Sequence, residues 1–338
     1  MAEFPAISFL GQGLNMAIPL LTTKDVRSAM TARPILQINE EDLRPINIGE
    51  HLSFGVRTVS LIGSRGKQDG QTYMVPREFT VSQNLSQVET FITFPTGDEA
   101  IAKFNSDPAF MSRLIPAAAS GNSLLKTLET RFIRSDNQYA FYSLRQPRYS
   151  ATILSNLNLP FDSETLQQVA IRDLPPFSTE NQSVVAQYRR FFQRFGSHVI
   201  TGVEFGSGYQ FIVSADRTQQ GVNDAWVEDV KADWGGIPSG GQFDKNIKDS
   251  SQYQEYKRLQ QRIEMINGGD DALAKAVATN PTYQTFQEWK GSVGHSQPIN
   301  FSLGDVWTLM KNSNNIEVAR AANDIQAAYE WIAHRRKL

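Results

Sequence analysis

Gly196 separates two segments with different hydrophobic periods, and this change constrains the fold more than any other feature of the sequence. Before it, apolar residues recur every three or four positions, which is typical of one face of an α-helix. Four residues form this face: Val184, Tyr188, Phe191 and Phe195. Thr179 and Gln182 predict a capping box at the helix start, and Gly196 has the position of a C′ glycine at its end. After Gly196 the period becomes two, which predicts a strand that continues to Val213.

The predicted strand contains three glycines, Gly202, Gly206 and Gly208. Glycine inside a strand indicates a bulge, a bend or the close approach of another backbone. Three glycines so close together favour a sharp bend of the strand. Tight packing of another element over a flat patch is the alternative interpretation, and composition alone does not separate the two.

Ser197 and His198, at the junction, are candidates for nucleophilic chemistry. Neighbouring side chains on a strand point to opposite faces, so we expect these two to diverge rather than to form a nucleophile–base pair. Gly206-Ser207-Gly208 lacks the G-x-S-x-G spacing of a nucleophile elbow. We therefore expect His198 to be a packing residue that joins the helix and the strand by hydrogen bonding.

The composition and the remaining motifs exclude several kinds of site. The chain has no cysteine, which excludes disulfides, thiolate zinc sites and thiol nucleophiles. Its four histidines show no metal-ligand spacing to one another or to carboxylates. Residues 63–67 (GSRGK) are too short for a phosphate loop, and residues 11–16 (GQGLNM) lack the third glycine of a dinucleotide fingerprint. We expect no metal, no cofactor and no enzymatic activity.

Charge and hydropathy do not indicate a nucleic-acid binder or a helical membrane span. The net charge is -2, whereas nucleic-acid binding needs a basic excess or a basic face. No stretch approaches the ~20 apolar residues of a transmembrane helix. Residues 1–21 lack the basic n-region of a secretory signal. We expect a soluble monomer with no evident signal peptide and no nucleic-acid partner.

The rest of the chain mixes predicted strands and helices, which places it in the α+β class. Strands are predicted over residues 69–83, 87–94 and 137–155, and helices over residues 98–134 and 316–337. Pro147 interrupts or bends the last of these strands. Residues 219–261 are polar and rich in turn residues. No low-complexity linker or repeat divides the sequence.

A helix that ends in Phe-Gly-Ser-His, followed by a strand with a glycine cluster, resembles the motif of the membrane attack complex/perforin (MACPF) family. The family motif has a Tyr upstream of an aromatic-Gly-Thr-His-aromatic core, and a glycine pair after a short gap. The matching residues are Tyr188, Phe195, Gly196, Ser197 and His198. Serine replaces the threonine, Val199 replaces the second aromatic residue, and Gly206-Ser207-Gly208 replaces the glycine pair.

The resemblance covers essentially the whole chain and implies a single MACPF domain over residues 1–338, with no C-terminal accessory domain. Residues 8–16 (SFLGQGLNM) are similar to the N-terminal strand of the family. Gly268 and Gly269, with residues 286–310, are similar to its final segment. The implied parts are a helical cluster at about 98–134, the motif helix and strand at 179–213, a second cluster at about 219–262 and a C-terminal helix at about 316–337.

The resemblance implies a MACPF/cholesterol-dependent-cytolysin-like fold, in which a strongly bent and twisted four-stranded antiparallel sheet is flanked by two helical clusters. In the family mechanism, monomers assemble into rings or arcs, and each cluster unfurls into a β-hairpin of a large barrel through the bilayer. The implied partners are other copies of the chain and a lipid membrane, with a separate membrane-targeting protein as a further candidate. We expect a Gly206→Val variant to be a folded monomer with defective assembly or hairpin release.

A hairpin that crosses the bilayer needs a lipid-facing apolar side on each strand. The candidate residues of the first cluster are Leu124, Leu128 and Phe132, and those of the second cluster are Phe243 and Ile247. Lys126 interrupts the first face, and the second segment carries charges on both alternating faces. A charge that faces lipid near the midplane costs roughly 2–4 kcal/mol. The sequence therefore supports the fold more strongly than it supports lysis.

The resemblance leaves two functions open. The first is a pore-forming protein that acts in cytolysis, as a toxin or in immunity or defence. The alternative is a non-lytic MACPF protein that acts in adhesion, development or assembly without membrane insertion, which does not depend on the polarity of the second cluster. The localisation also stays open, and release by a non-classical route followed by membrane association is one interpretation.

Overall fold

The structure is a computed structural model of the 338-residue chain. It describes residues 2–3, 9–18, 28–36, 38, 41–48, 71–83, 85–107, 136–153, 171, 173–216, 261–279, 283–292, 294, 296–313 and 315–335. The strands are β1 (Ala2–Glu3), β2 (Gln12–Leu14), β3 (Met30–Pro34), β4 (Leu43–Ile48), β5 (Gln71–Pro76), β6 (Phe79–Gln83), β7 (Val88–Phe94), β8 (Asn137–Ile153), β9 (His198–Asp216), β10 (Gln261–Asn267) and β11 (Gln297–Asp305). The helices are α2 (Gly97–Ser106), α6 (Gln182–Phe195), α10 (Asp271–Thr279), α11 (Tyr283–Lys290), α12 (Val306–Lys311) and α13 (Ile316–His334).

The central sheet is built around two long antiparallel strands, β8 and β9. The outer side of β8 pairs with β7 along its first half and with β6 along its second half. The outer side of β9 pairs with β11 along its N-terminal half and with β10 along its C-terminal half. The sheet is therefore four strand positions wide, and two shorter strands share each outer position. The prediction of a bent four-stranded antiparallel sheet in an α+β fold is confirmed.

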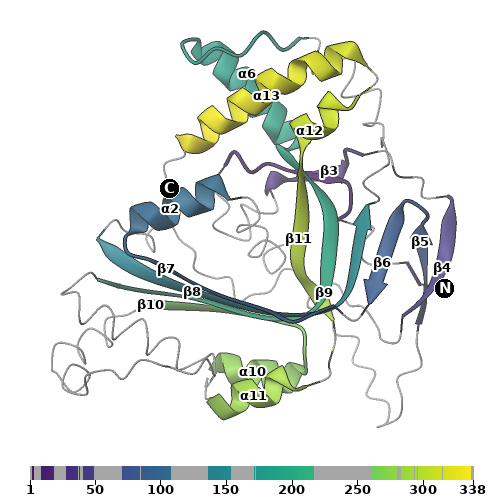
Figure 1. The fold of residues 1–338 in the computed structure, drawn as a ribbon, viewed down its shortest axis with the longest axis vertical. Coiled ribbons are helices and arrows are strands. Elements are labelled where there is room, and N and C mark those ends of the chain that lie inside the picture. Colours follow the sequence, from purple (N-terminus) through teal and green to yellow (C-terminus); the bar gives the residue numbers. More distant parts are fainter. Residues whose placement is uncertain are drawn as a thin grey trace.

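The strands of the sheet change register or pairing partner at one level, and we call this level the bend. β8 has a register shift between Pro147 and Tyr149, opposite Gly206 and Phe205 of β9. The outer partner of β9 changes from β11 to β10 between Gly206 and Gly208. Figure 1 shows the upper half of the sheet, with β11 and β6, standing upright, while the lower half, with β7 and β10, runs across the view. The long strands therefore change direction at the predicted glycines.

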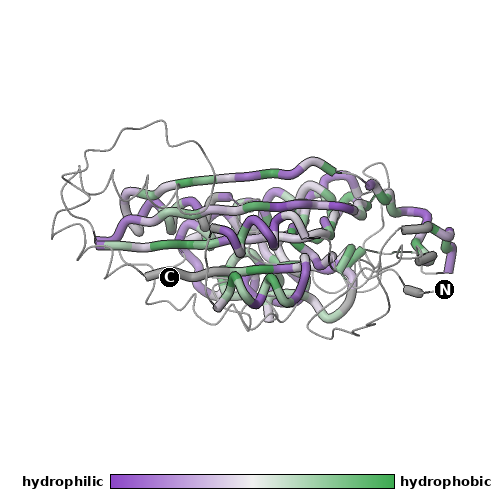
Figure 2. Tube along the Cα trace, turned by 90° about the horizontal axis from the view of Figure 1, so that it is seen from below, coloured by the Kyte–Doolittle hydropathy of each residue, from purple (hydrophilic) through white to green (hydrophobic). Residues whose placement is uncertain are grey.

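Helices cover both faces of the sheet. α6, α12 and α13 lie at the upper end and α2 lies on the inner side of the bend, whereas α10 and α11 lie on its outer side (Figure 1). A main core joins the upper half of the sheet to α6, α12 and α13, and a second core lies between the lower half and α10–α11. Hydrophobic and hydrophilic stretches are interspersed along the strands (Figure 2). β9 is buried on both faces along nearly its whole length, because the sheet has a packed layer on each side.

A separate three-stranded sheet, in the order β1-β5-β4, adjoins the upper half. A tight turn at Arg77 and Glu78 joins β5 to β6, so the chain passes directly from one sheet to the other. The Arg44 guanidinium donates a hydrogen bond to the Phe79 carbonyl at 2.7 Å and ties the two sheets together. Arg77 and Asp42 form an exposed ion pair at 2.7 Å beside this turn.

Three boundaries differ from those predicted. The cap of α6 is Asn181 rather than Thr179, because the Asn181 side chain accepts hydrogen bonds from the amides of Ser183 and Val184. β10 begins at Gln261, so the predicted second cluster at 219–262 ends inside a strand. α13 spans most of the predicted C-terminal helix and ends at His334. α2 is the described part of the first cluster, and the rest of both clusters lies outside the described residues.

Candidate functional site

Glycines from two segments make the junction between α6 and β9 possible. Gly196 has a φ of 79°, in the left-handed region that favours glycine. A Cβ atom on Gly196 would overlap the backbone of Leu14, and one on Gly13 would overlap the carbonyl of Phe195. β2 therefore passes against the end of α6 with no space for a side chain at either glycine.

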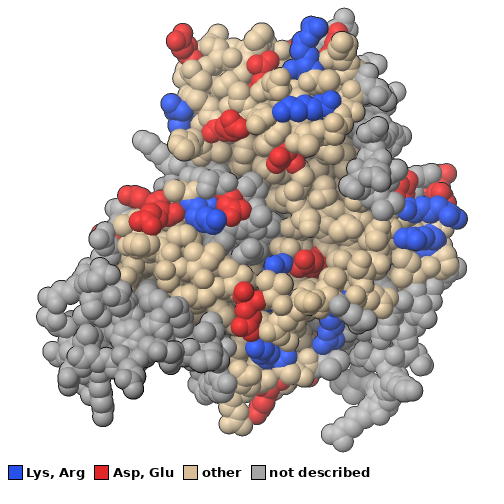
Figure 3. All heavy atoms as spheres, viewed as in Figure 1, with Lys and Arg blue, Asp and Glu red and all other residues tan. Residues whose placement is uncertain are grey.

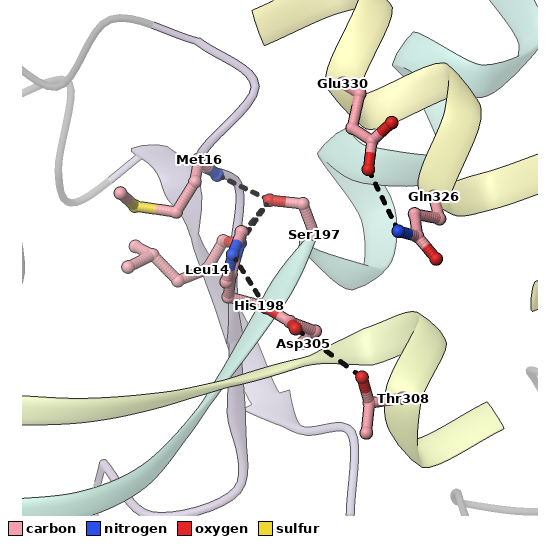
Figure 4. Close-up of polar contacts among 8 residues, drawn as sticks. All are labelled: Leu14, Met16, Ser197, His198, Asp305, Thr308, Gln326 and Glu330. Carbon is pink, nitrogen blue, oxygen red and sulfur yellow. Dashed lines mark hydrogen bonds and ion pairs between the residues drawn. The ribbon is translucent and has the colours of Figure 1, made fainter. Parts of the chain in front are cut away.

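Ser197 fastens this junction to β2 through its side chain (Figure 4). Its Oγ accepts a hydrogen bond from the Met16 amide at 2.8 Å and lies 3.3 Å from the Leu14 carbonyl oxygen and 2.9 Å from Nδ1 of His198. The hydroxyl has one hydrogen, which it donates either to Leu14 or to the imidazole, depending on the tautomer of His198. Ser197 is fully buried, so the hydroxyl is satisfied entirely by protein groups.

His198 joins the sheet to α12 and α13. Its ring makes edge contacts with Trp307 and Tyr329, with centroid separations of 5.4 and 5.0 Å. Its Nε2 lies 3.3 Å from Oδ1 of Asp305, an ion-pair distance without aligned hydrogen-bond geometry. The contact with His198 is the largest cause that lowers the pKa of Asp305, and Thr308 adds to it, while burial of the carboxyl opposes it.

The expectation that Ser197 and His198 diverge is wrong. β9 begins at His198, so Ser197 belongs to the turn at Gly196 and its side chain is free to face the imidazole. The resulting Ser–His–Asp string differs from a catalytic triad, in which serine contacts Nε2 and the acid contacts Nδ1. Here the two ring nitrogens are exchanged, and Ser197 and His198 are both buried, which denies a substrate access to them.

The two other aromatic residues of the motif pack α6 onto its surroundings. Tyr188 is buried, its hydroxyl donates to the Pro175 carbonyl at 2.8 Å, and its ring makes an edge contact with Phe177. Phe195 packs against Phe191 with a centroid separation of 5.1 Å. These contacts fix the helix that leads into the junction, so the motif residues form one connected structural unit.

The central strands approach most closely at Gly206. A Cβ atom there would overlap the Gln146 carbonyl on β8, whereas a Cβ atom on Gly208 would meet the Ile299 side chain at 3.2 Å. The two glycines therefore differ, because Gly206 faces rigid backbone and Gly208 faces a side chain that can shift. This overlap argues against the expectation that Gly206→Val leaves a folded monomer.

Arg145 and Glu204 form an ion pair across the bend. Nη1 of Arg145 lies 2.7 Å from Oε2 of Glu204, and the side chains are 10% and 28% exposed. The neighbouring Leu144 points to the other face, where it joins the second core with Trp289. The ion pair is therefore on the inner face of the bend, opposite α10 and α11.

On the outer face, α10 and α11 form a clip, residues 270–294, that begins at a glycine pair. Gly268 and Gly269 both have positive φ, 66° and 78°, and turn the chain from β10 into α10. Trp289 is fully buried against this turn, and its Nε1 donates to the Gly268 carbonyl at 3.1 Å. A Cβ atom on Gly269 would overlap the Trp289 ring, so the indole ring packs directly against the backbone of the glycine pair.

Polar contacts fasten the clip to β7 and β8. Lys290 pairs with Glu89 of β7 at 2.9 Å, and its carbonyl accepts a hydrogen bond from the Gln146 side chain at 3.0 Å. The Arg148 guanidinium donates to the Ser292 carbonyl at 3.4 Å. Sequence reasoning missed these residues, together with Arg145 and Glu204. On β7, β8 and β9 the one signal in the sequence is a charged or amide side chain inside a predicted strand, and Lys290 and Ser292 carry no such signal.

Two long segments leave the sheet and return to it at one level. Phe94 of β7 pairs with Tyr139 of β8, Tyr139 pairs with Ser214 of β9, and Ser214 pairs with Gln261 of β10. The segments between Phe94 and Tyr139 and between Ser214 and Gln261 thus begin and end on the same rung. The predicted hairpin residues lie in these segments, outside the described residues: Leu124, Leu128, Phe132, Phe243 and Ile247.

The described residues offer no other obvious site. They contain no group of three or more His, Asp or Glu side chains that could hold a metal ion. None of the helices in the described ranges is both long and apolar enough to cross a bilayer. Charges of both signs are interspersed over the described part of the face in Figure 3. The bend, with its ion pair and clip, and the junction at the start of β9 together form the candidate functional site.

The motif predicts a particular class of domain, and the structure has its parts. These are a bent antiparallel sheet, a helix–glycine–strand junction and two segments inserted at one end of the sheet. The sequence matches the family model described as the MAC/Perforin domain over residues 63–331. The chain belongs to the MACPF family. No curated protein sequence matched it.

A solved structure shows the same fold. The crystal structure of GNIP1Aa from Chromobacterium piscinae aligns over 98% of this chain and 56% of that chain, with a TM-score of 0.57 and 15% identity. A putative cell invasion protein with a MAC/Perforin domain from Bacteroides thetaiotaomicron aligns over 97% of this chain and 61% of that chain, with a TM-score of 0.43 and 10% identity. This chain thus spans less than two thirds of the length of either protein.

Proposed function

We propose that this chain is a pore-forming MACPF protein. Copies of it assemble on a membrane into a ring or arc, and residues 98–134 and 219–262 of each copy become β-hairpins of a large barrel. A separate protein that brings the chain to its membrane is a further candidate partner in this proposal. The proposal assigns no enzymatic step to the chain and gives Ser197 and His198 a structural role.

The observation that carries this proposal is the shared rung at the end of the lower half. β7 with β8, and β9 with β10, are antiparallel pairs that open toward the same end of the sheet. Each inserted segment connects the two strands of one pair, so an extended segment would lengthen a hairpin that already exists. A strand needs ~9–11 residues to cross a bilayer, and both segments are long enough for two such strands. The neighbouring strands β7, β8, β9 and β10 would then all become longer at the same end of the sheet.

The inner face of the lower half supports the same proposal. Asn137 Oδ1, Ser143 Oγ and Ser214 Oγ are buried on this face and have no hydrogen-bond partner within the part of the chain that the structure describes. A buried polar group without a partner costs about 1–3 kcal/mol. These side chains would recover hydrogen bonds on a face that lines water, as the lumen side of a large barrel does.

Dye release from liposomes, combined with electron microscopy of the same membranes, tests the proposal. We expect release of the dye together with rings or arcs on the vesicles, over a range of lipid compositions and with candidate partner proteins added. Heat-denatured protein provides the control for leakage that comes from aggregates. Intact vesicles without rings under all these conditions would contradict the proposal.

The polarity of the second segment favours one other function, that of a non-lytic MACPF protein in adhesion, development or assembly. Between residues 242 and 261, charges occupy both alternating faces of any strand, and each lipid-facing charge opposes insertion. This function predicts oligomers or partner binding without release of the dye. Rings on intact vesicles would therefore select it over the pore.

A further inference from the structure

The Arg145–Glu204 ion pair joins two residues that are not opposite one another in the sheet. Arg145 pairs in register with Gly208, and Glu204 pairs with Ser150. The bulge between Pro147 and Tyr149 lies between these two rungs. The ion pair therefore runs diagonally across the bend and links the lower half of β8 to the upper half of β9.

A straight sheet would hold this contact only with both side chains extended along the strands. Four residues of strand at ~3.3 Å each, combined with a strand spacing of ~4.8 Å, would place the two Cα atoms ~14 Å apart. On a flat sheet side chains stand roughly perpendicular to the surface, so Arg145 and Glu204 would have to lie flat and fully extended toward each other to meet. The bend tilts side chains on the inner face toward each other and so favours the observed distance of 2.7 Å.

The low exposure of both side chains makes the contact costly to break. Arg145 is 10% exposed and Glu204 is 28% exposed, so water and salt screen the pair less than they screen a surface ion pair. Opening the bend would separate the buried Arg145 charge from the partly buried Glu204 charge, and each would lose its partner before water could replace it. The pair thus adds a specific energetic barrier at the point where the glycines and the bulge make the strands easiest to deform.

We propose that Arg145 and Glu204 are a clasp that holds the sheet in its bent form and must separate before the sheet straightens. The clasp sets how readily the bend opens in the isolated chain. Its role in releasing the hairpins rests on the proposed pore-forming function, whereas its role in holding the bend does not.

Three variants of the full chain test the clasp against a matched control. Arg145→Met keeps an unbranched apolar side chain, shorter than arginine, and removes the charge, and Glu204→Gln keeps the shape of the side chain and removes its charge. The exchange R145E/E204R restores a pair of opposite charge across the same gap. Arg77→Met is the control, because it removes an ion pair of the same 2.7 Å length, with Asp42, at the exposed β5–β6 turn.

Hydrogen exchange in solution measures opening of the bend without any membrane. We expect Arg145→Met and Glu204→Gln to speed exchange of the β8 and β9 amides around the bend about tenfold, since a hydrogen bond between charged groups is lost. Amides of α13 should exchange at the wild-type rate, which separates local opening from general loss of stability. R145E/E204R should slow exchange at the bend again, and Arg77→Met should leave it unchanged.

Spin labels give a second measurement, because the chain has no cysteine and two can be introduced without background. Cysteines in place of Thr93 on β7 and Ser302 on β11, both exposed, report the distance between the lower and upper halves. We expect Arg145→Met to shift the population toward longer distances on vesicles, and to speed dye release about tenfold where the wild type releases dye. Unchanged exchange at the bend and unchanged distances in a folded Arg145→Met variant would overturn the clasp. Faster exchange with no dye release in any variant would support the clasp and contradict the pore.

Discussion

At the scale of single residues, Gly206 and Gly208 look equivalent in the sequence but have different surroundings. Gly206→Ala should lower the free energy of unfolding by about 3 kcal/mol, because its Cβ atom would overlap the Gln146 carbonyl and force β8 and β9 apart. Gly208→Ala should change it by less than about 1 kcal/mol, because the Ile299 side chain can shift and alanine has less freedom than glycine in the unfolded chain. Urea unfolding of the two variants beside the wild type measures the difference. Equal losses at the two positions would contradict a close backbone contact at Gly206.

At the scale of elements, Asp305 couples β9 to the start of α12 through its contact with His198. The pKa of Asp305 is lowered in the folded chain, so folding favours the charged carboxylate. Its contribution is complete above the pKa of the carboxyl in the unfolded chain, about 3.9, and is lost as the pH falls through the lower pKa of the folded chain. Because the Asp305 side chain is 43% exposed, we expect this contribution to be less than about 1 kcal/mol.

Asp305→Asn tests this coupling by urea unfolding at several pH values. The variant should be less stable than the wild type at pH 7, and the difference should shrink as the pH falls below about 4. Asp42→Asn, at an exposed ion pair far from the junction, is the control. A difference between Asp305→Asn and the wild type that stays constant down to pH 2 would show that the carboxylate charge is not the cause.

The elements that the sequence predicts well are those whose signal is local. The change of period at Gly196 locates both α6 and β9, and Pro147 marks the bulge of β8, because these patterns come from neighbouring residues. The cap of α6 is Asn181 rather than the predicted Thr179, although both are good capping residues. Local propensity alone does not make that choice.

The sequence does not specify the contacts between segments that are far apart along the chain. Arg145 meets Glu204 only because of the register of β8 on β9 and the angle of the bend, and no pattern in either strand encodes that angle. Trp289 lies in residues 286–310, which resemble the family's final segment, but its hydrogen bond to the Gly268 carbonyl depends on how the clip folds back onto β10. The family motif therefore predicts the architecture, while the charges that hold the bend appear only in three dimensions.

At the scale of the whole molecule, the two functions make opposite predictions for residues 123–132. Treated as one strand of a barrel, this segment places Leu124, Leu128 and Phe132 toward lipid, and Thr127, Glu129 and Arg131 toward the lumen. An environment-sensitive dye on single introduced cysteines should therefore brighten on vesicles at the first three positions and stay unchanged at the other three. The chain has no cysteine of its own, so each signal comes from one site.

The period of this signal decides between the structures that the segment can adopt on a membrane. Alternation with a period of two indicates a strand with one face in lipid, as the pore requires. A period of 3.6 would indicate an amphipathic helix lying on the membrane and would contradict the hairpin. No change at any position, on vesicles to which the protein binds, is the result that the non-lytic function predicts, because the segment then stays out of the bilayer while the sheet and its bend serve assembly alone.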